Sequence, residues 1–153
     1  RCLSDWSSDV CSSDLAMPQT VLVGVDGSEE SVRALRWAAK HVSDVGGIVH
    51  AAMIWHQPVQ FGYRLPTPDK ELEQRARTLL DGAVERIKSE FPKVDLRARL
   101  IRGHVVNEMV ALSKQADLLV VGNKGHGAFA GMMVGSVALK LVHHAACPVV
   151  VVR

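Results

Sequence analysis

The chain has few cysteines, few aromatic residues and no long apolar run. Of its 153 residues, three are cysteines and 5% are aromatic. Cys2 and Cys11 stand in the first 16 residues, and Cys147 stands beside Pro148 in an apolar stretch, which is typical of a small packed residue rather than a redox centre. No apolar run reaches the roughly 20 residues that a membrane-spanning helix needs. These absences exclude a disulfide-stabilised scaffold, and we expect a cytoplasmic protein with no membrane partner.

An excess of charge of one sign is also lacking. The 18 Lys and Arg residues nearly balance the 16 Asp and Glu residues, and the basic residues are scattered, so no nucleic-acid-binding surface is predicted. The sequence has no Walker lysine, no nucleophile elbow and no paired acid and base, so we assign no catalytic residue. The adjacent His143 and His144 would point about 100° apart on a helix, which is poor geometry for one metal ion.

The first 16 residues differ from the remainder of the chain. They show almost no apolar periodicity and repeat a Ser-Ser-Asp unit. Part of the stretch resembles the translation of a sequencing-library adapter, and it lacks the basic start and apolar core of a signal peptide. We therefore expect residues 1–16 to be a disordered, non-native leader and residues 17–153 to form one domain that begins at Met17.

From Thr20 onward, short apolar runs alternate with helical patterns. The runs are rich in valine, isoleucine and leucine, as in strands that are buried on both faces of a sheet. They predict strands at residues 20–25, 48–54, 94–101, 117–121 and 148–152. Helices are predicted to open near Ser28, Thr67, His104 and Ser136. This alternation predicts an α/β fold, a single-domain doubly wound parallel sheet with helices on both faces.

Two helix starts carry further signals. Ser28 precedes two glutamates, and Thr67 precedes Pro68, which suits an N-cap followed by proline at the first helical position. The long helix after Thr67 has an apolar side that we expect to be buried, formed by Leu72, Ala76, Leu79, Leu80, Ala83, Val84 and Ile87. Residues 55–66, before this helix, predict an irregular connection.

The most informative segment follows the fourth predicted strand. Its glycine-rich loop ends at Ser136, the expected N-cap of the last helix, and includes Gly122, Asn123, Lys124, Gly125, His126 and Gly135. A strand, a glycine-rich loop and a helix N-terminus cradle phosphate, because glycine lets the ligand approach the backbone and the first N–H groups of the helix point at the anion. The alternative interpretation is a tight turn followed by a capped helix.

Asp26, directly after the first strand, indicates the same place. In doubly wound sheets a ligand binds outside the carboxyl ends of the strands, where the strand order reverses. The ends of the first and fourth strands carry Asp26 and Gly122, so the two features converge on one crevice. Asp26 could contact the ligand or only cap the next helix and hold the turn at Gly27. Lys124 could contact phosphate or remain a solvated loop residue.

The spacing of Gly122, Gly125, Gly135 and Ser136 matches G-x2-G-x9-G-(S/T), the nucleotide-binding signature of the universal stress protein family. The chain resembles that family over residues 18–153. The resemblance implies a flavodoxin-like strand order 3-2-1-4-5, with Asp26 beside the ribose or adenine and Ile54 against the adenine. The chain departs from the family at Asn123 and Lys124, where Ser-Arg or Ser-His is frequent, and at Met53, where relatives often carry histidine.

The resemblance to ATP-binding members implies ATP, with Mg²⁺ accompanying it, as the ligand. The residues that it assigns to ATP are Gly24, Val25, Asp26, Ile54, Val121, Gly122, Asn123, Lys124, Gly125, His126, Gly135, Ser136 and Val137. It also implies a homodimer through the last strand. There, Val149, Val150, Val151 and Val152 would otherwise leave an unpaired sheet edge.

Three functions remain open at this stage. We adopt an ATP-binding regulatory module of the stress response, in which nucleotide occupancy rather than turnover carries the signal. The second possibility is a weak ATPase or a protein that phosphorylates itself at Ser136 or a nearby hydroxyl. The third is a nucleotide-free dimerisation module whose glycine loop only packs.

Overall fold

Five parallel strands form the central sheet of the computed structural model, which describes residues 18–57, 59–60, 63–64, 68–125 and 133–153. Neighbouring strands follow the order β5-β2-β1-β6-β7. Their bounds are β1 (Gln19–Gly24), β2 (Gly47–Trp55), β5 (Asp95–Arg102), β6 (Leu118–Gly122) and β7 (Val149–Val152). Counted along the chain within this sheet, the order is 3-2-1-4-5, so the predicted doubly wound fold is confirmed.

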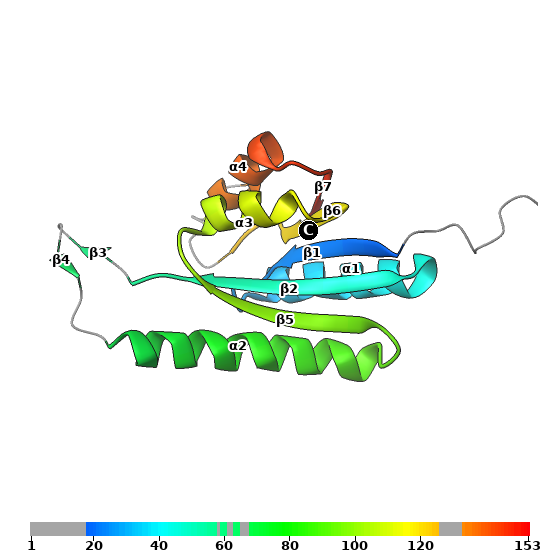
Figure 1. The fold of residues 1–153 in the computed structure, drawn as a ribbon, viewed down its shortest axis with the longest axis horizontal. Helices are drawn as coiled ribbons and strands as arrows, with labels where there is room; N and C mark the ends of the chain where they lie inside the picture. Colours follow the sequence, from blue (N-terminus) through cyan, green and yellow to red (C-terminus); the bar gives the residue numbers. More distant parts are fainter. Residues whose placement is uncertain (1–17, 58, 61–62, 65–67, 126–132) are drawn as a thin grey trace, which may run out of the picture.

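Helices cover both faces of the sheet in two layers (Figure 1). The first layer consists of α1 (Glu29–Val45) and α2 (Asp69–Glu90), and the second consists of α3 (Val105–Ser113) and α4 (Ser136–His144). Each layer has its own hydrophobic core against the sheet. We call them the α1–α2 layer and the α3–α4 layer.

Alternation along β1 explains why both cores reach the same strand. Val21 and Val23 pack in the core under the α1–α2 layer, whereas Leu22 packs in the core under the α3–α4 layer. All three are buried. A strand with apolar neighbours on both faces needs an unbroken apolar run, which is the pattern that the sequence shows.

The α1–α2 layer differs from the sequence prediction in three details. The β2–α2 connection contains a hairpin of β3 (Val59–Gln60) and β4 (Tyr63–Arg64), which the predicted irregular stretch missed. Pro68 takes an extended conformation as the N-cap residue, so α2 begins one residue later than predicted, and Thr67 lies outside the described residues. Leu79 was expected in the core but is 49% exposed, because it lies at the margin of the apolar stripe and covers Gly27 instead.

No helix in the described ranges is both long and apolar enough to span a membrane. The predicted leader, residues 1–16, lies outside the described residues.

Candidate functional site

A cavity of about 390 Å³ opens at the carboxyl ends of β1, β2 and β6, between the sheet and the α3–α4 layer. β1 lies between β2 and β6 in the sheet. The chain continues from β1 to one side of the sheet and later returns to the other, so the cavity lies at the reversal point of the strand order, where doubly wound sheets bind ligands. Its volume is in the range of small-molecule sites.

Sequence reasoning predicted most of the residues around this cavity. Every predicted ATP residue that the structure describes lines it, namely Gly24, Val25, Asp26, Ile54, Val121, Gly122, Asn123, Lys124, Gly125, Gly135, Ser136 and Val137. His126 lies outside the described residues. The register of β2 is also as expected, because Ile54 lines the cavity while Met53 is buried in the core on the opposite face.

Seven further lining residues were missed: Ser31, Ala52, His56, Val105, Met109, Ala138 and Leu141. Most are apolar and belong to β2, α3 or α4. A local apolar pattern marks such residues as core at most, because it does not tell which core side chains border an empty volume. His56 directly follows β2, and its position just beyond a strand end was the one signal that could have been used.

The lining divides by chemistry. β2 and α3 supply apolar side chains, including Ile54, Val105 and Met109, whereas the β1–α1 turn and the loop after β6 supply polar groups, including Asp26 and Lys124. A ligand that fills this volume therefore needs one apolar part and one polar or charged part.

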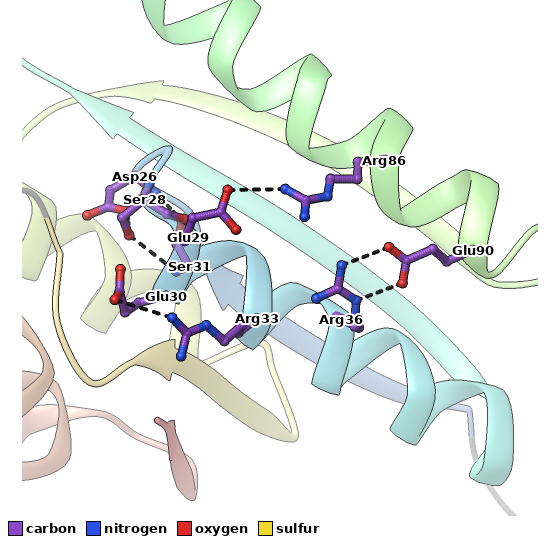
Figure 2. A network of polar contacts seen from close by, with 9 residues as sticks. All are labelled: Asp26, Ser28, Glu29, Glu30, Ser31, Arg33, Arg36, Arg86 and Glu90. Carbon is purple, nitrogen blue, oxygen red and sulfur yellow. Dashed lines mark hydrogen bonds and ion pairs between the residues drawn. The ribbon is translucent and has the colours of Figure 1, made fainter.

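Asp26 is held in the turn between β1 and α1 (Figure 2). Its Oδ1 accepts hydrogen bonds from the Ser28 backbone N–H at 3.0 Å and from the Ser28 hydroxyl at 2.5 Å. Ser28 is the N-cap of α1, where its Oγ accepts from the Ser31 N–H at 3.2 Å. Asp26 thus holds the turn at Gly27 through its Oδ1, and the cap of α1 is Ser28 rather than Asp26.

The three signature glycines meet different surroundings. A Cβ on Gly122 would lie 2.9 Å from the backbone carbonyl of Glu30 in the first turn of α1, so this glycine permits close strand–helix packing. A Cβ on Gly125 would collide with Asp26 Oδ2, so this glycine brings the loop against the carboxylate. A Cβ on Gly135 would be 3.4 Å from the nearest atom, the Asn123 carbonyl oxygen, which is ordinary contact.

The helix N-termini of α1 and α4 both approach the cavity, but they suit different groups. The first turn of α1 is capped by Ser28 and carries Glu29 and Glu30, whereas α4 has no side-chain cap and no acidic residue in its first turn. The positive end of the α4 dipole therefore suits an anion better than that of α1. Gly135 occupies the N-cap position and Ser136 is the first helical residue, so the prediction of Ser136 as N-cap was wrong by one residue.

Asn123 connects the loop after β6 to its surroundings. Its Nδ2 donates to the Met133 carbonyl at 3.4 Å, and its backbone N–H donates to the Val152 carbonyl at 2.7 Å. Its carbonyl accepts from the Gly135 N–H at 2.6 Å. Asn123 thereby joins the two ends of the glycine-rich loop and fixes where α4 starts.

The amino-acid sequence matches a known protein family over almost its whole length. The model of the universal stress protein family matches residues 17–153. A universal stress protein of Mycolicibacterium smegmatis is 32% identical over 145 residues, which are 95% of this chain and 48% of that relative. The chain thus spans about half the length of the curated relatives that it matches.

Solved structures share the fold. The universal stress protein UspA of Lactobacillus plantarum matches with a TM-score of 0.72 and 22% identity, over 90% of this chain and 99% of that one. A universal stress protein in complex with cAMP matches with a TM-score of 0.69 and 27% identity, over 88% of this chain and 97% of that one. With its strand order, its glycine signature and these matches, the chain belongs to the universal stress protein family.

Proposed function

We propose that this protein is a cytoplasmic ATP-binding module of the stress response, in which occupancy of the cavity carries the signal. The observation that carries the proposal is the divided lining of the cavity. The apolar side chains of β2 and α3 suit a purine base, and the glycine-rich loop with the α4 N-terminus suits a phosphate chain. The 27% identical structure in complex with cAMP supports a nucleotide as the ligand class.

The charges around the cavity set the direction of the nucleotide. Phosphates bind at Gly122, at Gly125 and at the α4 N-terminus, where Lys124 adds a positive charge. Asp26 repels phosphate and accepts hydrogen bonds, so it faces the ribose hydroxyls or the base. Within the described ranges no group of three or more His, Cys, Asp or Glu side chains could hold a metal ion. We propose that Mg²⁺ enters the site bound to the triphosphate.

Calorimetric titration with Mg-ATP tests this function. We expect saturable binding of one nucleotide per chain and weaker binding of inorganic triphosphate, because the latter lacks the base that the apolar part of the cavity favours. Incubation with radioactive ATP separates the three functions. Retention without product supports the regulatory module, release of phosphate or labelling of Ser136 supports an enzyme, and the absence of any binding leaves the dimerisation module.

We also propose a homodimer through β7, supported by the position of this strand at one edge of the sheet. The Leu119 N–H donates to the Pro148 carbonyl and the Asn123 N–H to the Val152 carbonyl. Alternation in a parallel ladder then leaves the backbone groups of Val149 and Val151 facing away from β6. On α4, which contacts β7, Leu139 and Val142 are about half exposed, at 52% and 51%.

Sedimentation velocity at tens of micromolar tests the dimer. We expect a wild-type dimer and a Val151→Pro monomer, because proline removes an outward N–H without removing a bond to β6. Val151→Ala is the control and should remain dimeric. A monomeric wild-type protein, with and without Mg-ATP, would contradict the proposal.

A further inference from the structure

Ser28 does not line the cavity itself, but it forms hydrogen bonds with two residues that do, Asp26 before it in the chain and Ser31 after it. Ser28 is buried, with 8% of its surface exposed. Its hydroxyl and its backbone N–H both donate to Asp26 Oδ1, at 2.5 Å and 3.0 Å. Two donors on one oxygen restrict rotation of the carboxylate, and a hydroxyl bond to an ionised acceptor is among the stronger hydrogen bonds of proteins.

The helix holds the Ser28 hydroxyl in this direction. Its oxygen accepts from the Ser31 N–H at 3.2 Å, as part of the N-cap of α1. The Ser31 hydroxyl in turn donates to the Ser28 carbonyl at 2.8 Å (Figure 2). An ionised carboxylate only accepts, so the single Ser28 hydroxyl proton points to Asp26 while its oxygen serves the helix.

The consequence appears at the other carboxylate oxygen. With Oδ1 fixed by Ser28, Asp26 Oδ2 lies against Gly125, at the place where a Cβ of that residue would collide with it. Both Asp26 and Gly125 line the cavity. The orientation that Ser28 imposes therefore directs Oδ2 to the glycine-rich loop, on the polar part of the lining.

We propose that Ser28 is a positioning residue of the nucleotide site, which orients the Asp26 carboxylate to accept a hydrogen bond from the nucleoside. The inference rests on the proposed function, since it concerns the same cavity. A nucleoside offers ribose hydroxyls and the base amino group as donors, and each requires a correctly directed oxygen. The N-cap of α1 and the binding site thus share one hydroxyl.

Four variants test the role by calorimetric titration with Mg-ATP and by thermal unfolding. Ser28→Ala should weaken binding about tenfold, the effect of one charged hydrogen bond that is misdirected, and should lower Tm. Ser28→Thr keeps the hydroxyl and should restore both. In the Asp26→Ala background, Ser28→Ala should weaken binding no further, because it acts through that carboxylate.

Ser113→Ala is the matched control for stability. Ser113 is 1% exposed, donates to the Val110 carbonyl at 2.7 Å and accepts from the Ala146 N–H at 2.9 Å. It is the last residue of α3 and does not line the cavity. Ser113→Ala therefore removes a buried hydroxyl that donates one hydrogen bond and accepts another, as the Ser28 hydroxyl does. We expect it to lower Tm as Ser28→Ala does and to leave the affinity for Mg-ATP unchanged.

Wild-type affinity in Ser28→Ala, with a lowered Tm, would overturn the inference and leave Ser28 as a helix cap alone. A further loss of affinity in the Asp26→Ala background would also overturn it. If the wild-type protein binds no Mg-ATP, the proposed function fails, and a crystal structure of Ser28→Ala without nucleotide then decides the inference. Rotation of Asp26 Oδ2 away from Gly125 would support positioning, and an unmoved carboxylate would overturn it.

Discussion

The two helix layers have the same neighbour, the central sheet, but they bury very different amounts of apolar surface. The α1–α2 layer has helices of 17 and 22 residues, whereas α3 and α4 have nine residues each. Among the described residues, nineteen buried side chains form the core under α1 and α2, and seven form the core under α3 and α4. The cavity lies in the sparser layer.

Polar contacts follow the same division. Arg36 pairs with Glu90 at 2.7 Å and Arg86 with Glu29 at 3.2 Å, so α1 and α2 are joined at two points (Figure 2). The α3–α4 layer has the Ser113 hydroxyl between α3 and Ala146, just past the end of α4. The comparison predicts that one layer supplies most of the stability, while the other is packed less completely and contains the cavity. The following predictions test that division.

The largest effect on stability should come from Leu35→Ala in α1. Leu35 is 0% exposed and lies in the denser core. Removing a buried leucine leaves a cavity and costs about 3 kcal/mol. Urea unfolding should give this loss, while the affinity of the variant for Mg-ATP at low temperature should equal that of the wild type. A loss below about 1 kcal/mol would contradict the assignment of stability to this layer.

The largest effect on binding should come from Gly125→Val. The side chain would collide with Asp26 Oδ2 and fill part of the cavity. We expect Mg-ATP affinity to fall at least about 100-fold, which corresponds to about 2.7 kcal/mol, with little change in unfolding free energy. Gly135→Ala is the control in the same loop, since its Cβ meets only ordinary contacts at a φ of −69°. Equal losses in the two variants would refute the separate roles of these glycines.

Met109→Ala should have an intermediate effect on stability and should also change binding. Met109 is 1% exposed and borders the cavity, so shortening its side chain would extend an existing open space rather than leave a closed void. We expect a loss of about 1–2 kcal/mol, less than for Leu35→Ala, together with weaker Mg-ATP binding. A stability loss as large as that of Leu35→Ala would show that the sparser layer is as tightly packed as the other.

His50 should have a smaller, pH-dependent effect on the free energy of unfolding. It lies on the side of β2 that faces the α3–α4 layer. Burial and the nearby Arg99 and Arg97 lower the pKa of His50 below 6.5, while Asp95 acts in the opposite direction. Below about pH 6.5 the unfolded chain therefore binds more protons at His50 than the folded chain does. The free energy of unfolding is accordingly highest above that pH and decreases as the pH falls toward the pKa of His50 in the folded protein. Urea unfolding of His50→Gln should show a shallower decline below about pH 6.5 than the wild type. Parallel profiles would contradict the prediction.

The smallest effect on stability should come from the exposed ion pair between Arg36 of α1 and Glu90 of α2. The hydrogen bond from Arg36 lowers the pKa of Glu90, but both side chains are more than one-third exposed. Exposed pairs contribute little because water and salt screen them. Glu90→Gln should therefore change Tm less than Leu35→Ala or Met109→Ala, and less still in high salt. A shift comparable to that of Leu35→Ala would mean that the pair, rather than the core, holds the layer together.

Much of this architecture was predictable because its determinants are local. The apolar runs gave the strands, and the spacing of Gly122, Gly125 and Gly135 indicated the loop before α4. Ser28 was identified as a cap from its residue type and the two glutamates after it. The misplaced cap at Ser136 and the missed β3–β4 hairpin were also local features, but each depends on dihedral angles that neighbouring residues of several types can adopt.

The sequence by itself determined the fold class, the edge of the sheet at which the cavity opens, and the residues of the β1–α1 turn and of the start of the loop after β6 that line it. Only the tertiary structure decided that Met109 and Leu141 border the cavity, that Leu79 covers Gly27, and that Asp26 Oδ2 lies against Gly125. The physical reason is that periodicity records which side chains avoid water. It does not record which atoms meet across elements that are far apart in the chain, because those contacts form only when the layers pack on the sheet.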